Sequence, residues 1–162
     1  MAQSTSPADT GRIAARLAEL GVTLPEAAKP IANYVPAVIT GDLLFISGQV
    51  PMREGKIAYT GKLGAGVPIE TGQEAAQLCF INVLAQAYAA LGSLDRVTRV
   101  VRLGGFIAAG PEFTQHAQVM NGASDMAVAV FDDAGRHARS TIGVPSLPGD
   151  AAVEVEAVFE IA

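Results

Sequence analysis

The C-terminal end of the chain constrains the fold more than any other stretch. It holds a short strand of the buried type around Arg139, then a Pro/Gly loop at 145–150, then a run at 152–161 that alternates apolar and acidic residues. Such alternation is typical of a strand that buries one face. An arginine in this setting needs a partner, because an unpaired buried charge is very costly. That partner is either a protein carboxylate, Glu154 or Glu156, or the carboxylate of a ligand.

Length and charge limit the classes of function. A chain of 162 residues predicts one domain, 1–162, that is long enough to bury a real core. The 11 Lys and Arg residues are outnumbered by 16 Asp and Glu residues, for a net charge of −5. Nucleic-acid binding relies on basic side chains that neutralise phosphates. We therefore expect no nucleic-acid partner, since the basic residues cluster only at Arg96, Arg99 and Arg102.

The sequence indicates no membrane partner and favours a cytoplasmic protein. No apolar run approaches the roughly 20 residues that a membrane-spanning helix needs. The start of the chain, MAQSTSPADTGR, lacks the basic and apolar regions of a signal peptide. The lone cysteine, Cys79, cannot form an internal disulfide, and a chain without disulfides suits a reducing compartment. Cys79 itself reads as a small core residue of a helix.

The N-terminal part reads as an extension ahead of the main fold. Residues 1–8 are expected to be disordered. Residues 9–30 form a helical extension, in which Asp9 or Thr10 caps a helix that ends at Gly21 and a proline-containing connector follows.

The rest of the chain alternates strand and helix patterns. We expect a hairpin at 36–50 that turns at Gly41-Asp42, a third strand near Lys56–Tyr59, helices at 70–91 and 112–131, a long strand at 97–108, and the two C-terminal strands. After the N-terminal helix this order is β-β-β-α-β-α-β-β. It predicts an α+β fold with a mixed sheet and helices on one face.

The last strand also predicts what covers the sheet. One side carries an apolar stripe that suits the helices: Val153, Val155, Ala157, Phe159 and Ile161. The opposite side carries Glu154, Glu156, Val158 and Glu160. One helix layer cannot cover both faces of a central strand, so we expect the uncovered face to pack against other copies of this chain.

Five segments together resemble the Rid family of reactive enamine/imine intermediate deaminases, also called the YjgF or L-PSP-type family. They are NYVPAV at 33–38, LLFISGQVP at 43–51, VVRLGGFIA at 100–108, ARS at 138–140 and LPGDAAVEVEAV at 147–158. The resemblance implies a chorismate-mutase-like fold and a homotrimer with clefts between subunits. Residues 1–30 lie outside the common core of the family and mark a longer N-terminal variant.

The resemblance also implies a site. Arg139 would hold a substrate carboxylate, and Glu154 would handle the hydrolytic water or the leaving nitrogen. Tyr34, Gly48 and Asn121 would line the cleft. Thr141 stands where many members have cysteine, which excludes chemistry that needs a thiol. The role implied for this position is a backbone N–H that helps to bind the carboxylate, and threonine also provides it.

The implied activity is hydrolysis of small 2-imino or 2-enamino acids to 2-oxo acids and ammonia, without a metal or cofactor. The two histidines, His116 and His137, have no metal-site spacing and are expected at the surface. Two alternatives remain open. One is a non-catalytic trimer that binds small carboxylates. The other is a ribonuclease, an older family label, which the acidic charge balance disfavours.

Five of the six site residues also have a purely structural interpretation. Arg139 would form an ion pair with Glu154 or Glu156, and it would lie near one of them if the last two strands pair directly. Glu154 would be a solvated strand residue. Tyr34 would pack in the protein, Gly48 would mark a β-bulge, and Asn121 would cap a helix.

Overall fold

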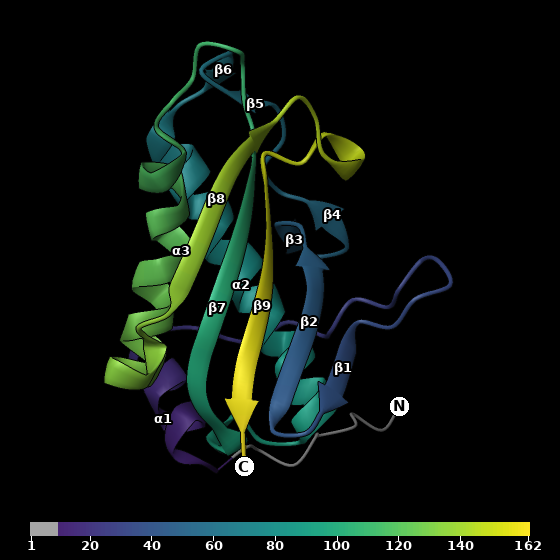
Figure 1. The fold of residues 1–162 in the computed structure, drawn as a ribbon, viewed down its shortest axis with the longest axis vertical. Helices are drawn as coiled ribbons and strands as arrows, with labels where there is room; N and C mark the ends of the chain where they lie inside the picture. The colour runs from purple at the N-terminus through teal and green to yellow at the C-terminus, as the bar shows by residue number, and fades with distance from the viewer. Residues whose placement is uncertain (1–9) are drawn as a thin grey trace.

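The computed structural model describes residues 10–162, in which a five-stranded sheet carries the helices on one face (Figure 1). The helices are α1 (Arg12–Glu19), α2 (Ile69–Leu91) and α3 (His116–Phe131). The sheet strands are β1 (Ala37–Thr40), β2 (Leu43–Gln49), β7 (Val97–Ala108), β8 (Ala138–Val144) and β9 (Val153–Ile161), in the order β1-β2-β9-β7-β8. Within this sheet, β7 and β8 are the one neighbouring pair that runs parallel. The predicted α+β fold with a mixed sheet is confirmed.

The predicted third strand does not join this sheet. The pair β3 (Met52–Arg53) and β4 (Lys56–Ile57) forms a separate antiparallel hairpin, and β5 (Lys62–Leu63) and β6 (Gly66–Val67) form a short parallel pair. The turn between β3 and β4 holds two residues with positive φ, Glu54 at 52° and Gly55 at 76°. This primed-type turn folds the chain back at once, so the two short strands pair with each other.

The core lies between the sheet and the helices α2 and α3. The apolar stripe of β9 is buried as predicted, and so is Cys79, whose thiol lies 3.4 Å from the carbonyl of Val153. Burial raises the pKa of Cys79 well above its usual value, which keeps the thiol protonated. The largest fully buried side chains include Phe80, Phe159, Ile13, Leu44, Leu63 and Leu84.

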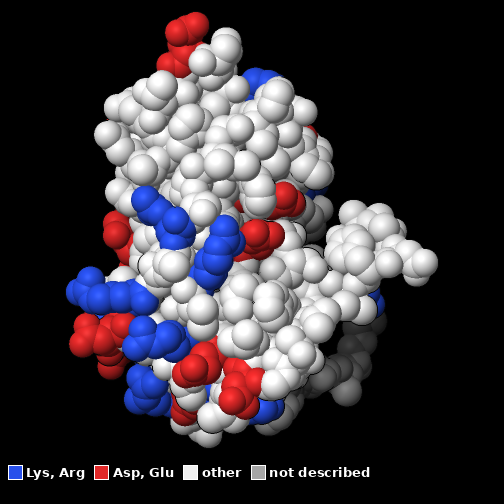
Figure 2. All heavy atoms as spheres, in the orientation of Figure 1, with Lys and Arg blue, Asp and Glu red and all other residues white. Residues whose placement is uncertain are grey.

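The other face of the sheet carries no helix, and Figure 1 shows it turned toward the viewer. A row of paired residues crosses it, from Val38 on β1 through Phe45, Val158 and Arg102 to Ala138 on β8. Val38 is 49% exposed and Phe45 is 42% exposed. Figure 2 shows basic and acidic side chains intermixed toward one end of this face and mostly uncharged atoms elsewhere.

Helix α1 is capped by a residue far away in the sequence. The predicted cap Thr10 is not used, and the other candidate, Asp9, lies outside the described residues. The N-cap position is Gly11. The carboxylate of Asp95 accepts hydrogen bonds from the backbone N–H groups of Arg12 and Ile13, both at 2.8 Å. These bonds lower the pKa of Asp95.

Helix α1 extends the helix layer at the C-terminal end of α3. Ile13 and Leu17 are buried in the core, and Arg16 Nε donates to the carbonyl of Ala129 on α3. The connector that follows α1 in the sequence is bonded to α2, because Gln86 Nε2 donates to the carbonyl of Ala28 at 2.7 Å. Within residues 10–162 no helix is both long and apolar enough to cross a bilayer.

Candidate functional site

Arg139 lies on the edge strand β8, half-buried, with its guanidinium against α3. Nη1 donates to Asn121 Oδ1 at 2.9 Å and to Ser124 Oγ at 3.0 Å. Nη2 makes a longer bond of 3.4 Å to the carbonyl of Ala117. All three acceptors are neutral. Among the residues that the structure describes, no carboxylate forms an ion pair with Arg139.

The proposed ion pair between Arg139 and a glutamate of β9 is therefore wrong. Glu156 lies instead beside Arg102, at 3.5 Å between Oε1 and Nη1. Glu154 is half-buried and makes no ion pair with any described residue. Its burial, and next the nearby charge of Glu156, raise the pKa of Glu154 above the usual glutamate value.

The last two strands do not pair directly, because β7 lies between them. Arg139 pairs with Leu103, which pairs with Ala157 of the buried stripe. Paired residues share a face of the sheet, so the side chain of Arg139 is on the helix side. Glu154 pairs with Phe106 on the helix-free side. The two predicted catalytic residues thus lie on opposite faces of one sheet.

Gly48 lies beside Glu154 and also shares a small hollow with Tyr34. The register of β2 against β9 shifts between Ile46 and Gln49, so the expected bulge at Gly48 is present. A Cβ on Gly48 would lie 2.9 Å from Glu154 Cδ. Tyr34, 54% exposed and hence not a packing residue, lines a hollow of about 110 Å³ together with Gly48.

The same hollow includes two buried glutamines that sequence reasoning missed. Gln86 Nε2 lies 3.4 Å from Gln49 Oε1, and Gln49 Nε2 donates to the carbonyl of Ser47. Buried amides are costly unless they are hydrogen-bonded. Gln49 belongs to the SGQ motif of β2, whereas no local pattern singles out Gln86.

The predicted residues Asn121 and Thr141 lie with Arg139 on the helix side. Helix α3 begins at His116 and not near residue 112, so Asn121 sits in its second turn and does not cap it. Thr141 pairs with Gly105, two positions along β8 from Arg139. Its Oγ1 is buried without a hydrogen-bond partner among the described residues.

Both histidines, expected at the surface, are partly exposed and partly packed. His116 is half-buried and meets Phe113 edge to face, with ring centroids 5.2 Å apart. His137 is half-buried and lies 2.9 Å from Ser124 Oγ through Nε2. Ser124 and His137 are thus further members of the Arg139 group. Strand alternation places His137 on the side of Arg139, and helical spacing places Ser124 one turn after Asn121.

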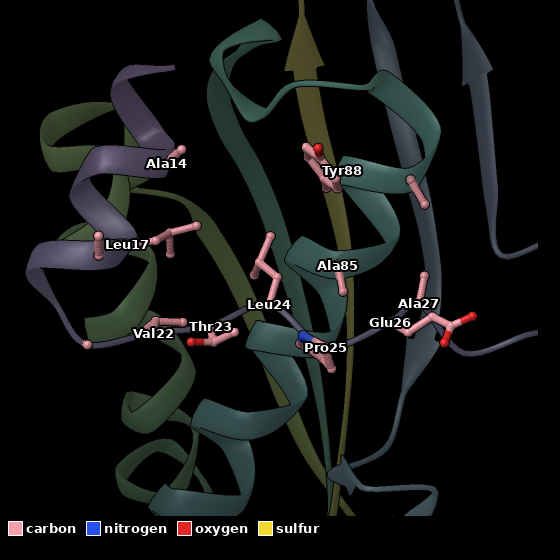
Figure 3. A pocket seen from close by; sticks show the side chains of 13 residues that line it. Ala14, Leu17, Val22, Thr23, Leu24, Pro25, Glu26, Ala27, Ala85 and Tyr88 are labelled. Carbon is pink, nitrogen blue, oxygen red and sulfur yellow. The ribbon is translucent and has the colours of Figure 1, made fainter. Parts of the chain in front are cut away.

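A further, larger hollow lies away from these residues. It measures about 780 Å³ between α1, the connector at 21–27 and α2 (Figure 3). Its walls are mainly apolar, with Leu17, Leu24 and Tyr88 among them, and its one charged side chain is Glu26. It contains no predicted site residue. In the part of the chain that is described, no group of His, Cys, Asp or Glu side chains is arranged to hold a metal ion.

Comparison with known proteins covers nearly all of the described residues. A family model described as YjgF/chorismate mutase-like, putative endoribonuclease, matches residues 14–161. "Protein TCP17" of Trypanosoma cruzi is 48% identical over 153 residues, which are 94% of this chain and 96% of the relative. A Dermatophagoides farinae protein named 2-iminobutanoate/2-iminopropanoate deaminase is 31% identical over 140 residues, 86% of this chain and 94% of its own.

Solved structures agree with this grouping. A protein of unknown function from Agrobacterium tumefaciens is 50% identical, with a TM-score of 0.87 over 93% of this chain and 92% of its own. The E. coli protein TdcF, solved with bound serine, is 26% identical, with a TM-score of 0.59 over 85% of this chain and 94% of its own.

Proposed function

This chain belongs to the YjgF/chorismate mutase-like family, and on that basis we propose that it hydrolyses small 2-imino or 2-enamino acids to 2-oxo acids and ammonia. The observation that carries the proposal is the state of Arg139. Its guanidinium is held by the neutral acceptors Asn121, Ser124 and Ala117. A half-buried cation without a carboxylate partner in the described chain is suited to an anionic ligand.

The Nε side of the guanidinium has the geometry for a carboxylate. Asn121 and Ser124 occupy Nη1, and Nε has no partner among the described residues. The edge formed by Nε and Nη2 is one of the two edges through which a guanidinium binds a carboxylate with parallel hydrogen bonds. We infer that the substrate carboxylate binds there, and that the orphaned hydroxyl of Thr141 lies near the bound ligand.

Glu154 suits the proton transfers of the reaction. Water adds to the imine carbon, the carbinolamine loses its nitrogen as ammonia, and the carbon becomes a carbonyl. The attacking water must lose a proton and the leaving nitrogen must gain one. A carboxyl group whose pKa is raised above the usual glutamate value can accept the first proton and donate the second. Gly48 leaves room beside this carboxyl group, since a Cβ there would press on it.

We propose a homotrimer in which each site is shared between neighbouring copies. Within one chain, Arg139 and Glu154 face opposite sides of the sheet, so a second copy is needed to bring both to one ligand. The exposed apolar side chains of the helix-free face, with Phe45, Val38 and Ile142 among them, support such packing. Sedimentation that shows a stable monomer at micromolar concentration would reject this assembly.

Two relatives support the substrate class. The Dermatophagoides farinae protein is named a deaminase of 2-iminobutanoate and 2-iminopropanoate, and both are small imino acids with a carboxylate. Serine, bound in the structure of TdcF, is also a small amino acid. Ribonuclease activity, which the family description includes, fits the surface less well, since basic and acidic side chains are intermixed on the helix-free face.

An oxidase assay tests the proposal directly. An amino-acid oxidase generates 2-iminobutanoate from 2-aminobutanoate, and ammonia release is followed with and without this protein. We expect release to quicken in proportion to the protein concentration. Binding of 2-oxobutanoate with no effect on the hydrolysis of any imine tested would reject catalysis and leave the non-catalytic carboxylate-binding trimer as the function.

A further inference from the structure

The imidazole of His137 has a defined proton arrangement. Its Nδ1 lies 2.6 Å from the carbonyl oxygen of Gly135. A carbonyl oxygen can only accept, so Nδ1 carries the proton and donates it. This carbonyl is well fixed, because a Cβ on Gly135 would overlap the backbone of Ala127 on α3. The close packing of Gly135 against α3 therefore sets the orientation of the ring.

The arrangement continues through Ser124 to Arg139. With the proton on Nδ1, the neutral ring has a lone pair on Nε2, which lies 2.9 Å from Ser124 Oγ. The hydroxyl of Ser124 donates to this lone pair. Its oxygen then accepts from Nη1 of Arg139 at 3.0 Å. Each bond that links Arg139, Ser124, His137 and Gly135 thus joins a donor to an acceptor.

The neutral form of His137 is the one that fits. Burial, the largest influence, lowers the pKa of His137, and the positive charge of Arg139 lowers it further, while the bond to Gly135 acts in the opposite direction. A protonated ring would turn Nε2 into a donor toward Ser124. The serine hydroxyl would then need another acceptor, such as a carbonyl of its own helix.

We propose that His137 is a positioning residue, which acts through Ser124 to hold Arg139 with its Nε edge presented to the substrate carboxylate. The inference rests on the proposed function, because it assigns the purpose of the hydrogen-bond series to the anchoring of that carboxylate. A guanidinium that is fixed before binding loses less conformational freedom when the ligand arrives. His137 therefore acts on binding, and not on the chemical step at the imine.

Substitutions along the series test this role. His137→Phe keeps a ring but removes both nitrogens, and Ser124→Ala removes the hydroxyl. We expect each to weaken the binding of 2-oxobutanoate about fivefold, the effect of one neutral hydrogen bond, with less than about a twofold change in the rate at saturating imine. The double variant should bind no more weakly than either single variant. His137→Gln, which places an acceptor near Nε2, should largely restore binding.

His116→Phe is the matched control, because His116, the first residue of α3, is also half-buried but has no bond to Arg139. It should bind 2-oxobutanoate like the parent. Additive losses in the double variant, parental binding by His137→Phe, or equal losses for His137→Gln and His137→Phe would each overturn the proposal. Thermal unfolding of all variants separates these outcomes from a loss of fold.

Nuclear magnetic resonance distinguishes a failure of this inference from a failure of the proposed function. The nitrogen signals of His137 should show a protonated Nδ1 and an unprotonated Nε2, and the Nε–H signal of Arg139 should broaden in His137→Phe. A proton on Nε2, or an unchanged Arg139 signal, overturns the positioning role. A parent protein that binds no 2-oxobutanoate but shows both signals as expected rejects the proposed function and supports the positioning of Arg139.

Discussion

Arg139 and Glu154 lie on opposite faces of the same sheet: Arg139 pairs through Leu103 with the buried Ala157, whereas Glu154 pairs with Phe106 on the helix-free face. The intervening strand β7 prevents β8 and β9 from pairing. One chain therefore holds two half-sites that face away from each other, and this geometry leads to the first prediction.

Mixed oligomers of two inactive variants should regain activity. Arg139→Ala and Glu154→Gln subunits, produced together with different tags, form mixed assemblies. If each site takes Arg139 from one copy and Glu154 from another, random mixing gives about a quarter of the sites both intact residues. The imine assay on mixed assemblies should show about that share of parental activity. No recovery at all would mean that one subunit supplies both residues.

Replacement of Arg139 should abolish the acceleration of imine hydrolysis. Arg139→Ala removes the cation that has no carboxylate partner among the described residues, at a cost of about 2–5 kcal/mol in binding, or tens to thousands of times. Arg139→Lys should recover only part, because lysine lacks the planar fork. Arg136→Ala, an exposed arginine paired with Asp133, is the control. Parental rates for Arg139→Ala would disprove the assignment.

The raised pKa of Glu154 should appear in the pH dependence of stability. Folding raises this pKa above the usual value of 4.5, so folding favours the protonated carboxyl. The protonated carboxyl of Glu154 therefore contributes to the stability of the folded state. This contribution is complete below the usual pKa and is lost as the pH rises through the raised pKa. Urea unfolding from about pH 4 to about pH 7 should therefore show a smaller loss of stability for Glu154→Gln than for the parent. Parallel curves would argue against a raised pKa.

A methyl group at residue 48 should impair the reaction more than the fold. The Cβ of Gly48→Ala would lie 2.9 Å from Glu154 Cδ and displace that side chain. Because the far end of Glu154 can move, we expect a loss of stability below about 1 kcal/mol with a clear fall in imine hydrolysis. Gly110→Ala adds a Cβ whose nearest neighbour is 3.5 Å away. This variant should retain the stability and the imine hydrolysis of the parent. Equal activity of the two variants would contradict a role for Glu154.

Loss of the Asp95 carboxylate should loosen α1. Asp95→Ala leaves the N–H groups of Arg12 and Ile13 without their acceptor, and we expect a loss of about 1 kcal/mol, the usual contribution of a helix cap. Hydrogen exchange of these two amides should quicken. Asp133→Ala, an exposed residue outside this contact, is the control. Unchanged exchange at both amides would show that α1 does not depend on Asp95.

Local patterns predicted the elements that depend on neighbouring residues. The strand at 97–108 and the turn at Gly41-Asp42 appear as expected, and the helix expected at 70–91 starts one residue earlier and ends before Gly92, which has a positive φ of 78°. The alternation in β9 correctly identified its buried stripe. These features follow from backbone periodicity and turn chemistry, which act over a few residues.

Contacts between distant residues were beyond such patterns. The cap of α1 comes from Asp95, 83 positions away from Arg12. Ser124 and His137 belong to the group around Arg139 although the sequence did not point to them, and neither candidate glutamate pairs with Arg139. No periodicity states which strands are neighbours, so the order β9-β7-β8 could not be derived from the order of the elements.

The sequence by itself determined the type and extent of most helices and strands, the side of β9 that is buried, and the family to which the chain belongs. Tertiary structure alone decided that β7 separates Arg139 from Glu154, that Glu156 lies beside Arg102, and that neutral groups of α3 surround the Arg139 guanidinium. The physical reason is that hydrogen-bond periodicity is local, whereas the environment of a charge depends on which remote segments pack beside it.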